Sequence, residues 1–131
     1  MKTGIIHIFP ACLFFILSCS NSDEKKCAKL KSGEFYYKGK IPRTGNIIYR
    51  NDSIQIVTEE QTGEKQKEKI VWTGPCSYEL YPAPDSKEDI LKSDLFPIRV
   101  SILEVTNRYY TVNVLSVNHK TEFNDTVWIA R

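Results

Sequence analysis

The sequence predicts an all-β fold: an antiparallel up-and-down meander of about eight short strands that closes as a small barrel or a sandwich. Three observations predict it. Short runs rich in Ile, Val, Tyr and Trp alternate with polar residues, Gly, Pro, Asn and Asp interrupt these runs, and the pattern begins only after an N-terminal apolar segment. Period-two alternation places one set of side chains on a core and the other in solvent.

The N-terminus has the layout of a secretory signal peptide. Lys2 precedes an apolar run over residues 5–17, and the small residue Ser18 stands directly before Cys19. A permanent membrane-spanning helix needs about twenty residues, so this run is too short to be one. We therefore expect residues 1–18 to be removed.

The residues around Cys19 indicate an anchor. Ile16-Leu17-Ser18-Cys19 resembles the bacterial lipobox, and the resemblance implies that Cys19 carries a diacylglycerol thioether and an acylated amino group. Each buried methylene contributes about 0.8 kcal/mol, so several acyl chains hold a protein on a membrane. The stretch over residues 20–24 resembles the acidic signal that places lipoproteins of Bacteroidetes on the outer face of the outer membrane. We expect attachment to the outer membrane, with the periplasmic and the surface-exposed face as alternatives.

The remainder divides into a tether and one domain. Residues 19–32 are polar and low in bulky apolar side chains, so we expect a flexible lipidated tether. Residues 33–131 are expected to form a single β-domain. The whole chain has a formal net charge of +2, which gives no electrostatic reason to expect nucleic acid as a partner.

Eight segments are candidate strands: residues 34–38, 46–50, 53–58, 67–73, 77–81, 98–105, 109–117 and 126–130. In the third, Ile54 and Ile56 face opposite Ser53 and Gln55. In the last, Val127 and Ile129 flank Trp128. Such alternation is typical of half-buried strands.

Turn residues separate these strands. Asn51-Asp52, Thr62-Gly63 and Gly74-Pro75 are expected to join antiparallel neighbours. Pro82-Ala83-Pro84 breaks the pattern. After it, Asp85 or Ser86 is expected to cap one helical turn through Ile90 and Leu91, with a plain loop as the alternative, before Pro97 restarts the sheet.

Two cysteines remain after the anchor. Outside the cytoplasm, Cys27 and Cys76 are expected to form a disulfide. A bridge across a loop of about fifty residues contributes roughly 4 kcal/mol of stability. The alternative is a pair of separate thiols, with Cys76 buried and Cys27 exposed.

The sequence gives no support for catalysis. His119 is the only histidine after residue 18, and it lies in an expected loop, so neither a histidine zinc site nor a serine triad is indicated. The acidic pairs Glu59-Glu60 and Glu88-Asp89 are expected in polar loops, where solvated carboxylates are usual. We expect no metal, no cofactor and no enzymatic activity.

Two short motifs are candidate modification sites. Asp52-Ser53-Ile54 and Asp125-Thr126-Val127 resemble the O-glycosylation sequon of Bacteroidetes. Ser53 and Thr126 would be the modified residues, and both are expected where a turn meets a strand. Ordinary turn capping by the aspartates is the alternative.

Several segments of the domain also resemble one family. They are Gly33-Glu34-Phe35, residues 47–56, Trp72 with residues 76–80, and residues 125–129. Together they resemble short exported proteins of flavobacteria and their relatives, some of which are labelled DNA topoisomerase IV. A chain of this size has no room for the nucleotide site and strand-passage machinery of such an enzyme, and its sequence contains no phosphate-cradling glycine loop. We therefore interpret that label as a naming error.

Two functions follow as hypotheses. The first is a lipid-anchored accessory protein of the cell envelope that contacts a protein partner through an exposed face. The second is a lipocalin-like barrel that binds a small apolar ligand, with a cavity lined by Tyr36, Tyr49, Trp72, Tyr78 or Tyr110. The short strands favour a filled core and therefore the first. A pocket of a few hundred Å³ inside the sheet would favour the second.

Overall fold

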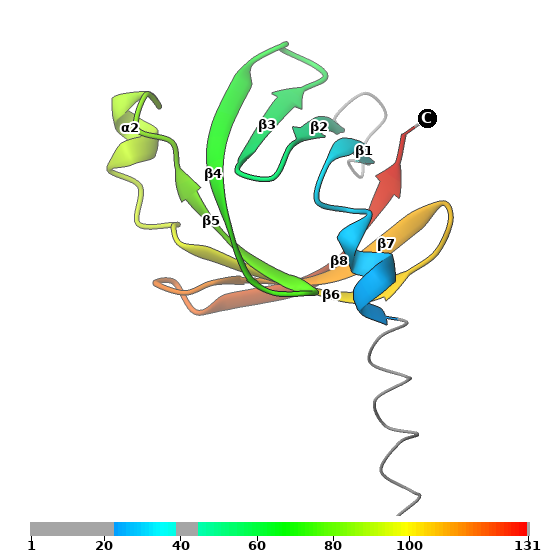
Figure 1. Cartoon of the computed structure of the whole chain (residues 1–131). Helices are drawn as coiled ribbons and strands as arrows, with labels where there is room; N and C mark the ends of the chain where they lie inside the picture. The colour runs from blue at the N-terminus through cyan, green and yellow to red at the C-terminus, as the bar shows by residue number, and fades with distance from the viewer. Residues whose placement is uncertain (1–22, 39–44, 131) are drawn as a thin grey trace, which may run out of the picture.

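The chain forms a closed antiparallel barrel, which confirms the predicted all-β meander and decides between barrel and sandwich (Figure 1). The computed structural model describes residues 23–38 and 45–130. Each strand pairs with the next one along the chain, and β1 pairs with β8 to close the barrel. The strands of the described residues are β1 Gly33–Tyr37, β2 Asn46–Arg50, β3 Ile54–Glu59, β4 Lys65–Gly74, β5 Ser77–Pro82, β6 Ile98–Val105, β7 Tyr109–Ser116 and β8 Thr121–Ile129.

The main difference from the predicted strands is at β8, which starts at Thr121 and not at residue 126. The turn lies earlier, over residues 117–120, where Lys120 adopts a φ of 56°. Asn124 and Asp125, which resemble turn residues in the sequence, instead pair with Asn113 and Val112 of β7. Cross-strand pairing over this length outweighs the weak strand propensity of Asn and Asp.

The expected helical turn is present as α2, Glu88–Leu91, between β5 and β6. Its N-cap is Lys87 and no side chain caps it, so the prediction of a cap from Asp85 or Ser86 is wrong. Both residues instead bind β4. Asp85 pairs with the ammonium of Lys67, and the Ser86 hydroxyl donates to the Lys67 carbonyl.

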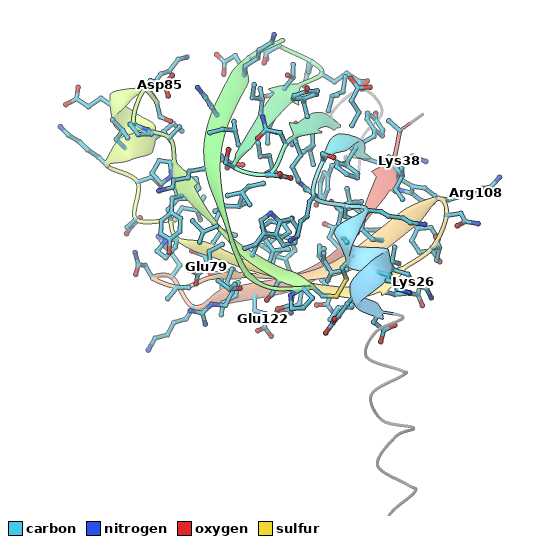
Figure 2. The ribbon with its side chains drawn as sticks, viewed as in Figure 1. Lys26, Lys38, Glu79, Asp85, Arg108 and Glu122 are labelled. Carbon is cyan, nitrogen blue, oxygen red and sulfur yellow. A yellow bond between two sulfur atoms is a disulfide. The ribbon has the colours of Figure 1, made fainter. Side chains whose placement is uncertain are left out.

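The barrel has two different ends. At the end where β1 starts, which we call the plugged end, residues 23–28 are helical and lie against the barrel. Cys27 of this segment is bonded to Cys76, confirming the predicted disulfide, which Figure 2 shows beside the helix that carries Lys26. The other end carries α2, and we call it the α2 end (Figure 1).

Residues 23–32 therefore differ from the flexible tether that their composition predicts. Cys27 and Leu30 are each only 2% exposed. The disulfide and the burial of Leu30 supply the stabilisation that a polar segment lacks by itself.

Apolar side chains fill much of the barrel interior. Phe35 packs edge-on against Tyr110, with ring centroids 5.6 Å apart, and the buried cluster also includes Ile48, Ile70, Leu80, Val100, Ile102, Val112 and Val127. This part of the barrel has the filled core that the short strands predict.

At the end of β2 and the start of β3, however, polar side chains face the interior. Arg50 lies opposite Gln55 in the register and both are buried inside the barrel. The residues of β2 that alternate with Ile48 and Arg50 point outward: Ile47 is 42% exposed and Tyr49 is 53% exposed. Alternation shows that the two faces of a strand differ, but pairing decides which face is inside.

Candidate ligand-binding site

Arg50, at the end of β2, organises the polar interior. It is 2% exposed, and its guanidinium donates four hydrogen bonds: Nη1 to the Leu30 carbonyl at 2.9 Å, Nε to Gln55 Oε1 at 3.0 Å, and Nη2 to the hydroxyls of Tyr110 at 3.0 Å and Tyr78 at 3.3 Å. A buried cation costs several kcal/mol unless its donors are satisfied in this way.

Aromatic rings surround the same guanidinium. Its carbon lies 4.5 Å from the ring centre of Phe35, and the rings of Tyr78 and Tyr110 lie within 6 Å. Cation–π attraction of this kind is strongest away from solvent. Burial raises the pKa of the Tyr78 hydroxyl, which therefore stays protonated at neutral pH.

A chain of hydrogen bonds leads from Arg50 towards the α2 end. Gln55 Nε2 donates to Glu68 Oε1 at 2.8 Å, and Gln66 Nε2 donates to Glu68 Oε2 at 2.8 Å. We call Arg50, Gln55, Glu68 and Gln66 the polar relay. It places a carboxylate that is only 5% exposed between two amides.

Burial and the partners of Glu68 have opposite effects on the pKa of its carboxyl group. Burial raises the pKa of its carboxyl, while the hydrogen bonds from Gln55 and Gln66 and the charge of Arg50 act in the opposite direction. Glu68 is thus a buried acid with both oxygens occupied by N–H donors.

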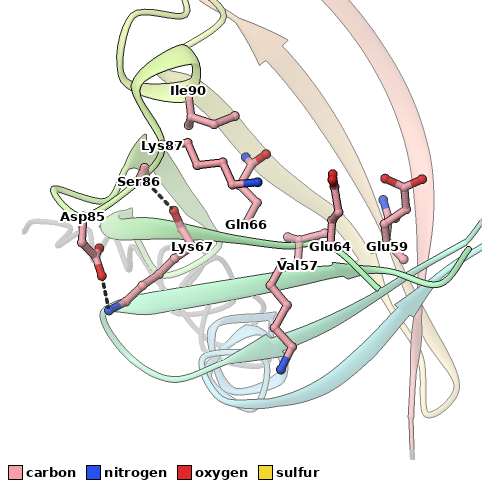
Figure 3. A pocket seen from close by; sticks show the side chains of 11 residues that line it. Val57, Glu59, Glu64, Gln66, Lys67, Asp85, Ser86, Lys87 and Ile90 are labelled. Carbon is pink, nitrogen blue, oxygen red and sulfur yellow. Dashed lines mark hydrogen bonds and ion pairs between the residues drawn. The ribbon is translucent and has the colours of Figure 1, made fainter. Parts of the chain in front are cut away.

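The relay ends at a pocket of about 410 Å³ at the α2 end. Figure 3 shows its walls: Val57 and Gln66 come from the inner side of β3 and β4, and Ile90 and Lys87 lie across from them. Glu59 and Glu64, from the turn that joins β3 to β4, also line it. The pocket thus combines an apolar wall, an amide and charges of both signs.

Strand β4 places its two relay residues and its lysines on opposite faces. Gln66 and Glu68 face the interior because they pair with Val57 and Gln55, whereas Lys65, Lys67 and Lys69 occupy the opposite face. This arrangement removes the ammonium groups of β4 from the polar relay.

The structure divides the aromatic residues that a binding barrel was expected to place inside. Tyr78 is buried in the core, Tyr110 is fully buried, and Trp72 packs against Tyr78 with ring centroids 4.8 Å apart. Tyr36 and Tyr49 lie outside, because Phe35 and Ile48 take the inward positions of their strands. None of the five lines the pocket at the α2 end.

The candidate modification residues lie in different settings. Cys19 is outside the described residues. Ser53 is exposed in the turn before β3, as expected, and its backbone N–H donates to Asn51 Oδ1. Thr126 lies within β8 opposite Thr111 and is half-buried, so its expected position at the start of a strand is wrong.

His119 lies in the turn between β7 and β8. Its Nε2 is 2.7 Å from Asp94 Oδ1, and both side chains are exposed. The hydrogen bond from His119 lowers the pKa of Asp94.

Residues 23–38 and 45–130 contain no group of three or more His, Cys, Asp or Glu side chains placed to hold a metal ion. Over the same part of the chain, no helix is long and apolar enough to cross a bilayer.

Sequence reasoning missed the polar relay. Its signal was nonetheless present in residues 65–70, Lys-Gln-Lys-Glu-Lys-Ile, where a run of uniformly polar residues ends on an apolar one. The alternation of cationic and uncharged or acidic side chains shows that the two faces of this strand have different surroundings.

Comparisons of the chain with protein-family models, curated proteins and solved structures find no match.

Proposed function

We propose that this protein is a lipid-anchored, non-enzymatic barrel of the cell envelope that binds a small polar ligand in the pocket at its α2 end. The observation that carries the proposal is the polar relay, which runs through the barrel interior and reaches that pocket. Buried polar groups reduce stability unless they are fully paired. Barrels of eight strands have room for one small ligand at the mouth.

The setting of this function is also a proposal. Cys19 would hold the protein on the outer membrane through its acyl chains. The Cys27–Cys76 disulfide supports a compartment outside the cytoplasm, because such bonds persist in oxidising environments. The proposal differs from the lipocalin-like hypothesis in one respect. The lining of the pocket at the α2 end favours a polar ligand, not an apolar one.

A matched pair of substitutions on β3 tests the binding function. Val57→Phe would fill the pocket, whereas Ile56→Phe adds the same ring on the outer face of the same strand. In a nuclear magnetic resonance screen of small polar compounds, hits should shift the signals of Gln66 and Ile90. Val57→Phe should abolish these shifts and Ile56→Phe should retain them. A screen without any hit at these residues would exclude the proposed function.

A second candidate, the envelope accessory protein, is favoured by the outer surface. The register places Tyr109, Trp128, Tyr36 and Ile47 side by side across β7, β8, β1 and β2. We call these four residues, three aromatic and one aliphatic, the outer aromatic row. Ile47 is 42% exposed and the three rings are half-buried. A row of apolar side chains at the surface of one side of a protein is typical of interaction surfaces.

Photo-crosslinking tests this second candidate function. A crosslinking amino acid at position 49, next to the outer aromatic row, should capture one discrete envelope protein. The same amino acid at position 122, on the exposed outer face of β8, is the control. Equal products from both positions would rule out a specific partner at this face.

A further inference from the structure

Arg50 fixes the direction of every hydrogen bond in the polar relay. A guanidinium carries only donors, so Gln55 must turn its oxygen towards Arg50 and its Nε2 towards Glu68. Glu68 then accepts from Gln55 at one oxygen and from Gln66 at the other. The orientation of each amide is therefore set by the residue before it.

The last amide of the relay meets the pocket with a defined polarity. Since Gln66 Nε2 is engaged by Glu68, the acceptor Gln66 Oε1 is left for the pocket that this residue lines. Within the part of the chain that the structure describes, no donor is hydrogen-bonded to this oxygen. A buried carboxylate thus makes the inner wall of the pocket an acceptor.

Two carboxylates of the pocket lining favour the same kind of ligand group, a donor with positive charge. Glu59 and Glu64 line the pocket on the side of the β3–β4 turn, where the Glu59 N–H donates to the Glu64 carbonyl. Lys67 is paired with Asp85. The remaining lysines of the lining are Lys65, which extends from the outer face of β4, and Lys87, which lies on the opposite wall beside α2.

We propose that the ligand is a small primary amine whose ammonium group donates to Gln66 Oε1 between the carboxylates of Glu59 and Glu64. Its apolar part would lie against Val57 and Ile90. This inference rests on the proposed function, since it specifies the ligand class of the same pocket. Glu68 acts in it as a positioning residue, because it touches Gln66 and not the ligand.

Two probes of matched shape test the inference: isobutylammonium and isovalerate share one branched carbon skeleton and carry opposite charges. In titrations of the full chain followed through the Gln66 side-chain amide and the methyl groups of Val57 and Ile90, isobutylammonium should bind about tenfold more tightly. Tenfold corresponds to about 1.4 kcal/mol, the magnitude of one charge-assisted hydrogen bond.

Glu68→Gln tests the role of the relay. A glutamine at this position must direct its oxygen to Gln55, whose orientation Arg50 fixes, and its Nε2 to Gln66. Gln66 then turns over and presents N–H groups to the pocket. We expect the tenfold preference for the amine to disappear or to invert. Glu64→Gln is the matched control: it removes the same charge from the pocket wall, where it should lower amine affinity without inverting the preference.

Gln66→Met provides a second variant that does not alter the buried carboxylate. It removes the proposed acceptor and should abolish the preference while the two probes still contact Val57 and Ile90. Equal binding of both probes by the unmodified chain, or tighter binding of isovalerate, would overturn the amine inference and leave the proposed function standing. Unchanged preference in both Glu68→Gln and Gln66→Met would also overturn it. Absence of any shift with either probe would overturn the proposed function itself.

Discussion

Replacing Arg50 by methionine tests whether the buried guanidinium holds the barrel interior together. Methionine is also unbranched, but it removes all four hydrogen bonds of Arg50, including the one to the Leu30 carbonyl at the plugged end. The substitution leaves Gln55 Oε1 and the Glu68 carboxylate inside the barrel without their cation. Breaking a buried charged network by removing one partner costs about 3–5 kcal/mol, a large share of the 5–15 kcal/mol typical of a whole domain.

The effect of Arg50→Met should depend on pH with a defined sign. Burial raises the folded-state pKa of Glu68 above its ordinary value of 4.5, and the charge of Arg50 opposes this rise. A raised carboxyl pKa reduces stability as pH increases through the interval between the unfolded and the folded pKa. Without Arg50 that interval extends upward, so the loss of stability should be larger at pH 7 than at pH 5.

Urea denaturation at both pH values measures this directly, since the midpoint and slope give the free energy of unfolding. Arg99→Met is the control, because Arg99 forms an exposed ion pair with Glu79, and such pairs contribute about 1 kcal/mol or less. If Arg50→Met cost less than about 1 kcal/mol, or the same amount at both pH values, the polar relay would not be the stabilising unit described above.

Three further outcomes are expected. Replacing both Cys27 and Cys76 by alanine should lower the free energy of unfolding by about 4 kcal/mol in chemical denaturation, because the bridge closes a loop with a sequence separation of 49; a loss under about 1 kcal/mol would contradict this. Lys120→Gly should stabilise the chain by about 0.5–1 kcal/mol in the same assay, since Lys120 adopts a φ of 56° that glycine tolerates; destabilisation would refute the reasoning. Cys19→Ser should release the protein from sedimented membranes, and retention in the membrane pellet would exclude the anchor.

The candidate site was much less predictable than the fold, and Ile54 and Ile56 show why. Their alternation with Ser53 and Gln55 identifies a strand with two unlike faces, and the apolar pair is the natural choice for the core. In the barrel, Gln55 is 5% exposed and the isoleucines lie on the other face. The sequence carries no local mark of this reversal, because the residue that requires it, Arg50, belongs to the preceding strand and meets Gln55 only through the register.

The strand Lys65–Gly74 illustrates the same limit. Its lysines, glutamine and glutamate are all polar, so composition alone does not separate a solvated face from a buried one. Glu68 is buried because Gln55 and Gln66 supply its donors. A buried carboxylate is stable only with partners in place, and those partners are defined by pairing between β3 and β4.

What the sequence by itself determined is local: the number and order of the strands, most of their turns, and a disulfide between Cys27 and Cys76. These follow from short-range alternation, turn chemistry and a small count of cysteines. Tertiary structure alone decided the closure of β1 on β8, the packing of residues 23–32 over one end, and the choice of Arg50, Gln55 and Glu68 as interior residues. The physical reason is that the free energy of burying a polar group depends on the partners it meets inside, and those partners come from other strands.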